Sequence, residues 1–141
     1  MSLFGAMDVS ASGLTAERLR MDLIASNLAN ANTTRTPEGG PYRRLMAVLV
    51  PEAVRSAGHP MKRVGGGVRV QAIIQDPNPP RLVYQPDHPD ADAEGYVAYP
   101  NVNPVTEMVD LITATRAYEA NVTAFNAAKG MATKALEIGR A

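Results

Sequence analysis

The chain has 141 residues, no cysteine, and 14 basic against 14 acidic side chains, so its formal net charge is +0. The absence of cysteine excludes disulfide scaffolds, cysteine-based metal sites and cysteine nucleophiles. The charges also balance within residues 1–35, 36–103 and 104–141, which carry three, seven and four residues of each sign. No segment is therefore a basic arm for nucleic acid, and no lysine-rich amphipathic face predicts membrane binding.

The N-terminal stretch from about residue 10 to residue 30 has apolar residues spaced alternately three and four apart, which is typical of a helix in a coiled coil. Ser10 or Ser12 is a candidate N-cap for this helix. The asparagine-rich run that follows weakens helical preference, because short polar side chains compete for backbone hydrogen bonds. The helix should therefore end near Asn30.

Four short strands are predicted in the middle of the chain, at residues 42–50, 67–75, 81–85 and 95–99. The second alternates, which places Val68, Val70, Ala72 and Ile74 on one face. Prolines between these runs oppose helix and keep the strands short. Residues 56–67 carry few large apolar side chains, end in three glycines and predict a loop.

A second long helix is predicted from Pro104, with Asn103 as its N-cap and Gly139 at its end. About 33 residues at 1.5 Å rise give a rod of roughly 50 Å. The fold class is therefore α+β: long N- and C-terminal helices paired as a coiled coil, with a small antiparallel β-rich middle domain. The expected divisions are residues 1–35, 36–103 and 104–141.

The second helix carries the same three-and-four spacing of its stripe residues as the first, so each has a coiled-coil stripe. Two helices cannot cover all of their own apolar flanks, so these two stripes predict an oligomer or a larger helical array. The residues expected to form the assembly interface are the large apolar members of the two stripes. They are Met7, Leu14, Met21, Leu28, Met108, Leu111, Tyr118, Val122, Phe125 and Leu136.

Candidate chemistry is confined to the acidic run at residues 87–94, which also contains His88. Its oxygens could bind a hard cation, but the run lacks the spacing of a calcium loop, and a solvated turn is the favoured interpretation. The chain has two histidines and no tryptophan, which argues against a hydrolytic triad or an aromatic-lined glycosidase cleft. We expect no catalytic residue, no cofactor and no bound metal.

Residues 25–34 and 39–44 resemble the N-terminal signature of bacterial flagellar rod and hook proteins. Residues 94–105, continued by residues 107–109 and 116–121, resemble the signature that opens the C-terminal helix in the same family, and residues 76–80 and 88–91 resemble its proximal-rod members. The positions that carry the resemblance are Asn27, Asn30, Thr33, Gly40, Tyr42, Gly95, Tyr96, Asn101, Asn103, Glu107 and Met108.

The resemblance implies a structural subunit of the flagellar basal body, exported without a cleaved signal peptide, that assembles into a hollow rod across the periplasm. Its terminal helices would line the tube, transmit torque and enclose the export channel. The implied partners are the other proximal and distal rod proteins, the rod–ring adaptor, the inner-membrane ring and, during secretion, the export apparatus.

Two other functions remain open at this point. One is a periplasmic peptidoglycan hydrolase, although the sequence offers no convincing acid–base pair. The other is a cytoplasmic coiled-coil adaptor or secretion chaperone.

Overall fold

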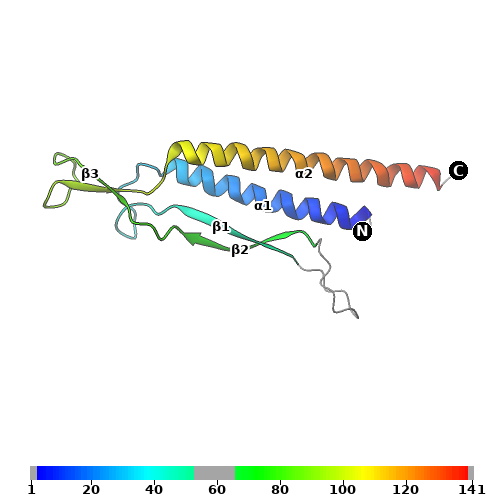
Figure 1. The fold of residues 1–141 in the computed structure, drawn as a ribbon, viewed down its shortest axis with the longest axis horizontal. Helices are drawn as coiled ribbons and strands as arrows, with labels where there is room; N and C mark the ends of the chain where they lie inside the picture. Colours follow the sequence, from blue (N-terminus) through cyan, green and yellow to red (C-terminus); the bar gives the residue numbers. More distant parts are fainter. Residues whose placement is uncertain (1–2, 53–65, 140–141) are drawn as a thin grey trace.

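The computed structural model describes residues 3–52 and 66–139. In chain order the elements are α1 (Leu3–Ala29), β1 (Leu45–Pro51), β2 (Val68–Gln75), β3 (Arg81–Tyr84), β4 (Tyr96–Tyr99) and α2 (Pro104–Ile138). Two long helices lie side by side, and two separate two-stranded sheets accompany them (Figure 1). The α+β class is confirmed. Neither helix, over its described residues, is long and apolar enough to cross a membrane.

The two helices are antiparallel, with both termini at the same end of the molecule (Figure 1). Asn27 near the end of α1 bonds to Glu107 near the start of α2, and Gly13 lies against Asn121. Both pairs are consistent with a single antiparallel register of α1 against α2. Because α2 has 35 residues and α1 has 27, the C-terminal turns of α2 extend past the start of α1.

The helix ends test the predicted caps. Asn103 is confirmed as the N-cap of α2, since its Oδ1 accepts hydrogen bonds from the amides of Val105 and Thr106 at 3.0 and 3.5 Å. The predicted start of the first helix near residue 10 is wrong, because α1 already begins at Leu3. Ser12 is no cap: its hydroxyl accepts from the amide of Val68 at 3.1 Å and thereby ties α1 to β2.

The face of α2 that is buried differs in part from the predicted stripe. The apolar spacing of this helix predicts a stripe that includes positions Met108, Thr115 and Lys129. The buried positions Glu107, Ala114 and Ala128 each fall one residue before one of these. The alternate predicted positions are half-buried and agree with the stripe; they are Leu111, Tyr118, Phe125 and Ala132. Small residues explain the shift, since a Cβ added to Gly13 would lie 2.9 Å from the Asn121 side chain. The helix backbones approach closely where side chains are small.

Strands β1 and β2 pair antiparallel from Leu45↔Gln75 to Pro51↔Val68, and both lie along α1. The register shifts between Val48 and Leu49, which leaves Gln71 of β2 without a partner in a β-bulge. The predicted alternation of β2 is right before the bulge, where Val68 and Val70 are half-buried. It is wrong after the bulge, where the two remaining members, Ala72 and Ile74, are exposed.

Strands β3 and β4 form a hairpin that projects beyond the helix ends, away from the termini (Figure 1). The core of the described residues is thin. Its buried hydrophobic side chains are Ala16, Ile24, Ala31, Val97, Val102, Ala114 and Ala128. The accessible surface of 10138 Å² exceeds the roughly 7000 Å² of a compact 15 kDa monomer. The chain is therefore less compact than a typical monomer of its mass, and many of its large hydrophobic side chains are exposed.

Candidate functional site

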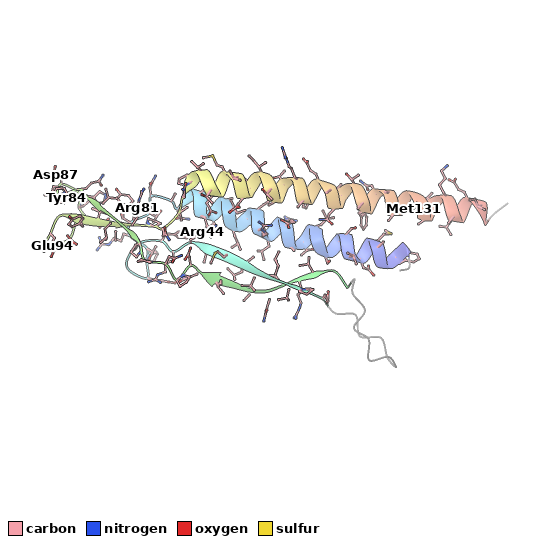
Figure 2. The ribbon with its side chains drawn as sticks, viewed as in Figure 1. Arg44, Arg81, Tyr84, Asp87, Glu94 and Met131 are labelled. Carbon is pink, nitrogen blue, oxygen red and sulfur yellow. The ribbon has the colours of Figure 1, made fainter. Side chains whose placement is uncertain are left out.

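A buried polar cluster lies where α1, β1 and α2 meet, and we call it the junction: Asn27, Tyr42, Arg44, Leu45 and Glu107. Figure 2 shows Arg44 at this end of the helix pair. Asn27 and Glu107 are each 1% exposed. Burial of polar groups is costly unless every hydrogen-bonding atom finds a partner, so the partners at the junction decide its role.

Asn27 uses its full hydrogen-bonding capacity. Its Nδ2 donates to the Leu45 carbonyl at 2.9 Å and to Glu107 Oε2 at 3.1 Å. Its Oδ1 accepts from the Leu45 amide at 2.9 Å and from the Tyr42 hydroxyl at 3.0 Å. The amide thus pairs with both backbone groups of Leu45, as a residue of a neighbouring strand would, and fixes the start of β1 to α1.

Glu107 joins the third element to this cluster. Arg44 Nε forms an ion pair with Glu107 Oε1, and the same guanidinium reaches Asp110 Oδ2 at 3.5 Å. Among the described residues, no buried side-chain nitrogen or oxygen lacks a partner. Every group at the junction is engaged in holding elements together, so its chemistry is structural: it sets the register of α1, β1 and α2.

Other positions of the predicted motif shape the turn that returns the chain to the junction. Asn30 Nδ2 donates to the Ser26 carbonyl at 2.9 Å, and Thr33 Oγ1 donates to Asn30 Oδ1 at 3.2 Å. The Tyr42 amide donates to the Thr33 carbonyl at 3.0 Å. Gly40 takes a φ of 77°, which favours glycine. These bonds bring the Tyr42 ring back toward α1.

The second half of the motif builds the hairpin and the start of α2. Gly95 has a φ of 85°, and a Cβ there would lie 2.8 Å from the Tyr84 ring. Tyr84 and Tyr96 meet edge to face with centroids 5.4 Å apart. Asn103 caps α2. Asn101, in contrast, is exposed and lines a small pocket.

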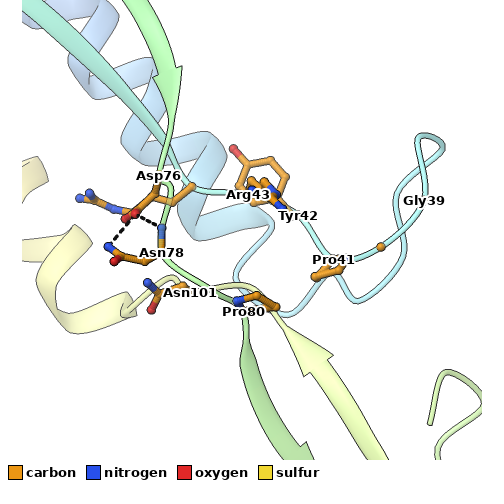
Figure 3. Close-up of a pocket in the computed structure, with 10 residues that line it drawn as sticks. Gly39, Pro41, Tyr42, Arg43, Asp76, Asn78, Pro80 and Asn101 are labelled. Carbon is orange, nitrogen blue, oxygen red and sulfur yellow. Dashed lines mark hydrogen bonds between the residues drawn. The ribbon is translucent and has the colours of Figure 1, made fainter. Parts of the chain in front are cut away.

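That pocket, of about 130 Å³, lies between the turn at residues 39–44 and the segment at residues 76–80 (Figure 3). Asp76 lies on its wall, and its Oδ1 already accepts from the amide and the side chain of Asn78 at 2.9 and 2.7 Å. Pockets for small molecules usually enclose about 300–1000 Å³. This pocket therefore offers no convincing ligand site.

The acidic run at residues 87–94 lies at the turn between β3 and β4, where Figure 2 labels Asp87 and Glu94. Asp92 Oδ1 accepts from the amides of Glu94 and Tyr96 at 2.9 and 2.8 Å, and Asp90 accepts from Thr34 Oγ1 at 2.9 Å. Within residues 3–52 and 66–139, no three histidine, aspartate or glutamate side chains group as a metal site would require. These carboxylates shape the turn and tie the hairpin to the loop after α1.

The predicted assembly residues fall into two sets. Met108 is 52% exposed and Leu136 is 71% exposed. The other members are half-buried; they are Met7, Leu14, Met21, Leu28, Leu111, Tyr118, Val122 and Phe125. Whether any of them contacts a second molecule stays a prediction.

Three exposed apolar residues close to Met108 on α2 were not among the predicted assembly residues. Val105, Val109 and Ile112 are each more than half exposed, and with Met108 they form what we call the base stripe. Their spacing of i, i+3, i+4 and i+7 is the signal that could have revealed this surface. The set of large apolar residues at the start of α2 is therefore broader than the predicted one.

Two known protein families match the two regions of the chain that carry most of the motif positions. A family described as flagella basal body rod protein matches residues 7–35. A family described as flagellar basal body rod FlgEFG protein C-terminal matches residues 93–138. The matched regions contain Asn27 and Glu107, the two most deeply buried side chains of the junction.

Curated relatives match along nearly the whole chain, and each carries the name flagellar basal-body rod protein FlgC. The protein of Bacillus subtilis is 51% identical over 99% of this chain and 100% of its own length. That of Borreliella burgdorferi is 46% identical over 98% of both chains. That of Yersinia enterocolitica is 44% identical over 99% of this chain and 100% of its own. The chain therefore belongs to the FlgC family of flagellar basal-body rod proteins.

Proposed function

We propose that this chain, a structural subunit of the flagellar basal-body rod, assembles through its two long helices into the hollow shaft of the proximal rod. The observation that carries the proposal is the base stripe. Four large apolar side chains stand exposed within two turns of α2, although fully burying each would contribute about 1.5–3 kcal/mol. A monomer gains nothing from such a surface, whereas a subunit of an assembly does.

The position of the base stripe supports contacts between molecules. Val105 and Ile112 each lie two residues from a buried position, Glu107 and Ala114 respectively, which is about 200° around the helix. Since Glu107 and Ala114 are buried, the base stripe points to the other side of α2. The α1–α2 pair therefore presents an apolar surface that its own helices leave uncovered.

The finer features of the proposal follow the predicted divisions of the chain. Residues 1–35 and 104–141 form the axial core as a coiled coil, and residues 36–103 form the β-rich outer part. The tube encloses the export channel and transmits torque, and the chain has no catalytic role. Its partners are the other proximal and distal rod proteins, the rod–ring adaptor and the inner-membrane ring. It reaches the periplasm through the export apparatus without a cleaved signal peptide.

The base stripe gives the proposal a direct test. Ile112→Asp places a charge in the stripe, whereas Thr113→Asp places the same charge one residue away at an exposed position. We expect Ile112→Asp to remove the chain from purified basal bodies and abolish motility, and Thr113→Asp to leave both intact. Helix content of each purified variant, measured by far-UV circular dichroism, should equal that of the wild type. Normal motility with Ile112→Asp would contradict the proposal.

The two alternatives predict different locations and activities. A secretion chaperone would remain in the cytoplasm and be absent from purified basal bodies. A peptidoglycan hydrolase would clear a zymogram of cell-wall material. The rod subunit should co-purify with basal bodies and leave the zymogram unchanged.

A further inference from the structure

We propose that His88 is a pH-sensitive switch, which holds the β3–β4 hairpin against the loop after α1 while its imidazole is neutral and releases the hairpin when the imidazole is protonated. This switch is a property of the single chain and is independent of the proposed function. Three features carry it: the attachment of the hairpin, the part that Asp90 plays in that attachment, and the protonation state that the hydrogen bond of His88 requires.

The β3–β4 hairpin has few attachments to the rest of the molecule. Among the described helices and strands, β3 and β4 contact only each other, and the hairpin projects beyond the helix ends (Figure 1). An isolated two-stranded hairpin is only marginally stable in water, because it has no further strand or helix to pack against. Contacts outside the strands must therefore hold this hairpin in position.

Asp90, in the turn between the two strands, makes two contacts of this kind. Its Oδ2 accepts a hydrogen bond from Thr34 Oγ1 at 2.9 Å, and its Oδ1 lies 3.8 Å from Arg35 Nη1. Both partners belong to the loop after α1, and we call the two contacts the latch. The Arg35 side chain is exposed, so its ion pair contributes little, and the hydrogen bond from Thr34 is the main contact of the latch.

The position of Asp90 depends on His88. The Asp90 amide donates to His88 Nδ1 at 3.1 Å, which closes a turn around Pro89 in the way that an asparagine or aspartate side chain closes an Asx turn. Two backbone hydrogen bonds support this turn: the His88 amide donates to the Gln85 carbonyl at 3.1 Å, and the Ala91 amide donates to the His88 carbonyl at 3.0 Å. The turn sets the direction in which the Asp90 carboxylate points.

The hydrogen bond to His88 Nδ1 requires a neutral imidazole. A neutral ring has one donor and one acceptor nitrogen, whereas both nitrogens of a protonated ring are donors. Protonation of His88 therefore sets its Nδ1–H against the N–H of Asp90 and removes the hydrogen bond. The new Nδ1–H attracts the Asp90 carboxylate instead, and the carboxylate is drawn away from Thr34. Histidine ordinarily changes its charge between pH 5 and 8, which sets the range in which the switch is tested.

The charged and titratable groups around His88 come from the turn, the two strands and the loop after α1. They are Asp87, Asp90, Asp92, Glu94, Arg81, Tyr99 and Arg35. The His88 and Tyr99 rings meet edge to face with centroids 6.4 Å apart, and the Arg81 guanidinium lies 5.8 Å from the centroid of the Tyr99 ring. A test must therefore separate the titration of His88 from that of the carboxylates beside it.

Spin labels on engineered cysteines test the switch, because the natural chain has no cysteine. A label at Leu82→Cys reports on the hairpin and a label at Thr113→Cys on α2, and both positions are exposed. Double electron–electron resonance on the full-length chain measures the distance between the labels. We expect one narrow distance distribution at about pH 7.5. At about pH 5 the fraction of molecules outside it should rise at least roughly 2-fold, as the loss of one hydrogen bond predicts.

His88→Asn is the matched control, because an asparagine oxygen can accept from the Asp90 amide but does not titrate. We expect this variant to keep the narrow distribution at both pH values, and Asp90→Ala, which lacks the latch, to give the broader distribution at both. A labelled chain with His88 intact that shows the same distribution at both pH values would overturn the switch. An equal response to pH in His88→Asn would also overturn it, since another group would then be the one that titrates.

The tautomer of His88 gives a second test that does not depend on the hairpin. In the full-length chain with His59→Gln, His88 is the one histidine that remains. Nitrogen NMR of the imidazole at about pH 7.5 should show a bare Nδ1 and a protonated Nε2, because Nδ1 must accept from the Asp90 amide. A neutral ring that carries its proton on Nδ1 would overturn the proposal.

Discussion

The two ends of the helix pair differ in how they are held. At the junction, a buried amide and a buried ion pair join three elements, and every polar atom has a partner. Toward the termini, the buried contact positions of the helices are small residues such as Ala16 and Ala128. One end is therefore held by specific polar contacts, and the other by the close packing of small residues.

This difference has a physical reason. A row of alanines permits helices to approach closely but allows several registers of similar energy. A buried polar group allows one register, because any shift leaves it unpaired at a cost of about 1–3 kcal/mol for each neutral group. The junction can therefore fix the register of the whole helix pair from one end, and the helical turns near the termini need no specifying contacts of their own.

We expect replacement of Glu107 to cause the largest loss in the free energy of unfolding. Glu107→Ala leaves Arg44 without its main partner and Asn27 without one acceptor, and breaking a buried ion pair costs about 3–5 kcal/mol. We expect the free energy of unfolding, measured by urea titration with far-UV circular dichroism, to fall by that amount. Glu119→Ala, at an exposed position of α2, should change it by less than about 0.5 kcal/mol. Equal effects of the two changes would mean that the junction does not hold the fold.

The sequence predicted the local features of both regions. Strand limits were right within a few residues because prolines and glycines mark them, and Asn103 was found because an asparagine before a proline is a familiar helix start. The order of elements and the α+β class followed from these local signals.

Local sequence signals could not predict the junction or the packing of the two helices. Arg44 and Glu107 are 63 residues apart, and no local sequence pattern indicates that they form an ion pair. The buried face of α2 was placed one residue off at alternate positions, because the apolar pattern selects large residues such as Met108, whereas the close contact uses Ala114 and Ala128. The resemblance had marked Asn27 and Glu107 as motif positions, but it gave them no physical role.

Gly67→Ala tests the tie between α1 and β2 and should have an intermediate effect. Gly67 has a φ of 92°, and an added Cβ would collide with the Ser12 hydroxyl. We expect a loss of about 1–2 kcal/mol in the free energy of unfolding, from backbone strain together with the displaced hydroxyl.

A double-mutant cycle with Ser12→Ala separates the two causes. If the collision matters, Gly67→Ala will cost less when the Ser12 hydroxyl is absent, because only the backbone strain remains. An identical cost in both backgrounds would assign the whole effect to the backbone and would remove Ser12 from the argument.

Gly130→Ala should give the smallest effect, with the opposite sign. Gly130 lies inside α2, and an added Cβ would meet nothing within 4 Å. Alanine is favoured over glycine in a helix interior by about 1 kcal/mol, so the isolated chain should gain roughly that much stability in thermal unfolding. Gly13→Ala is the matched contrast, because its Cβ would meet Asn121 at 2.9 Å, and it should destabilise the chain. If Gly130→Ala stabilises the isolated chain yet lowers incorporation into basal bodies, the space beside Gly130 is occupied by a neighbouring molecule in the rod, and this part of α2 is a contact surface.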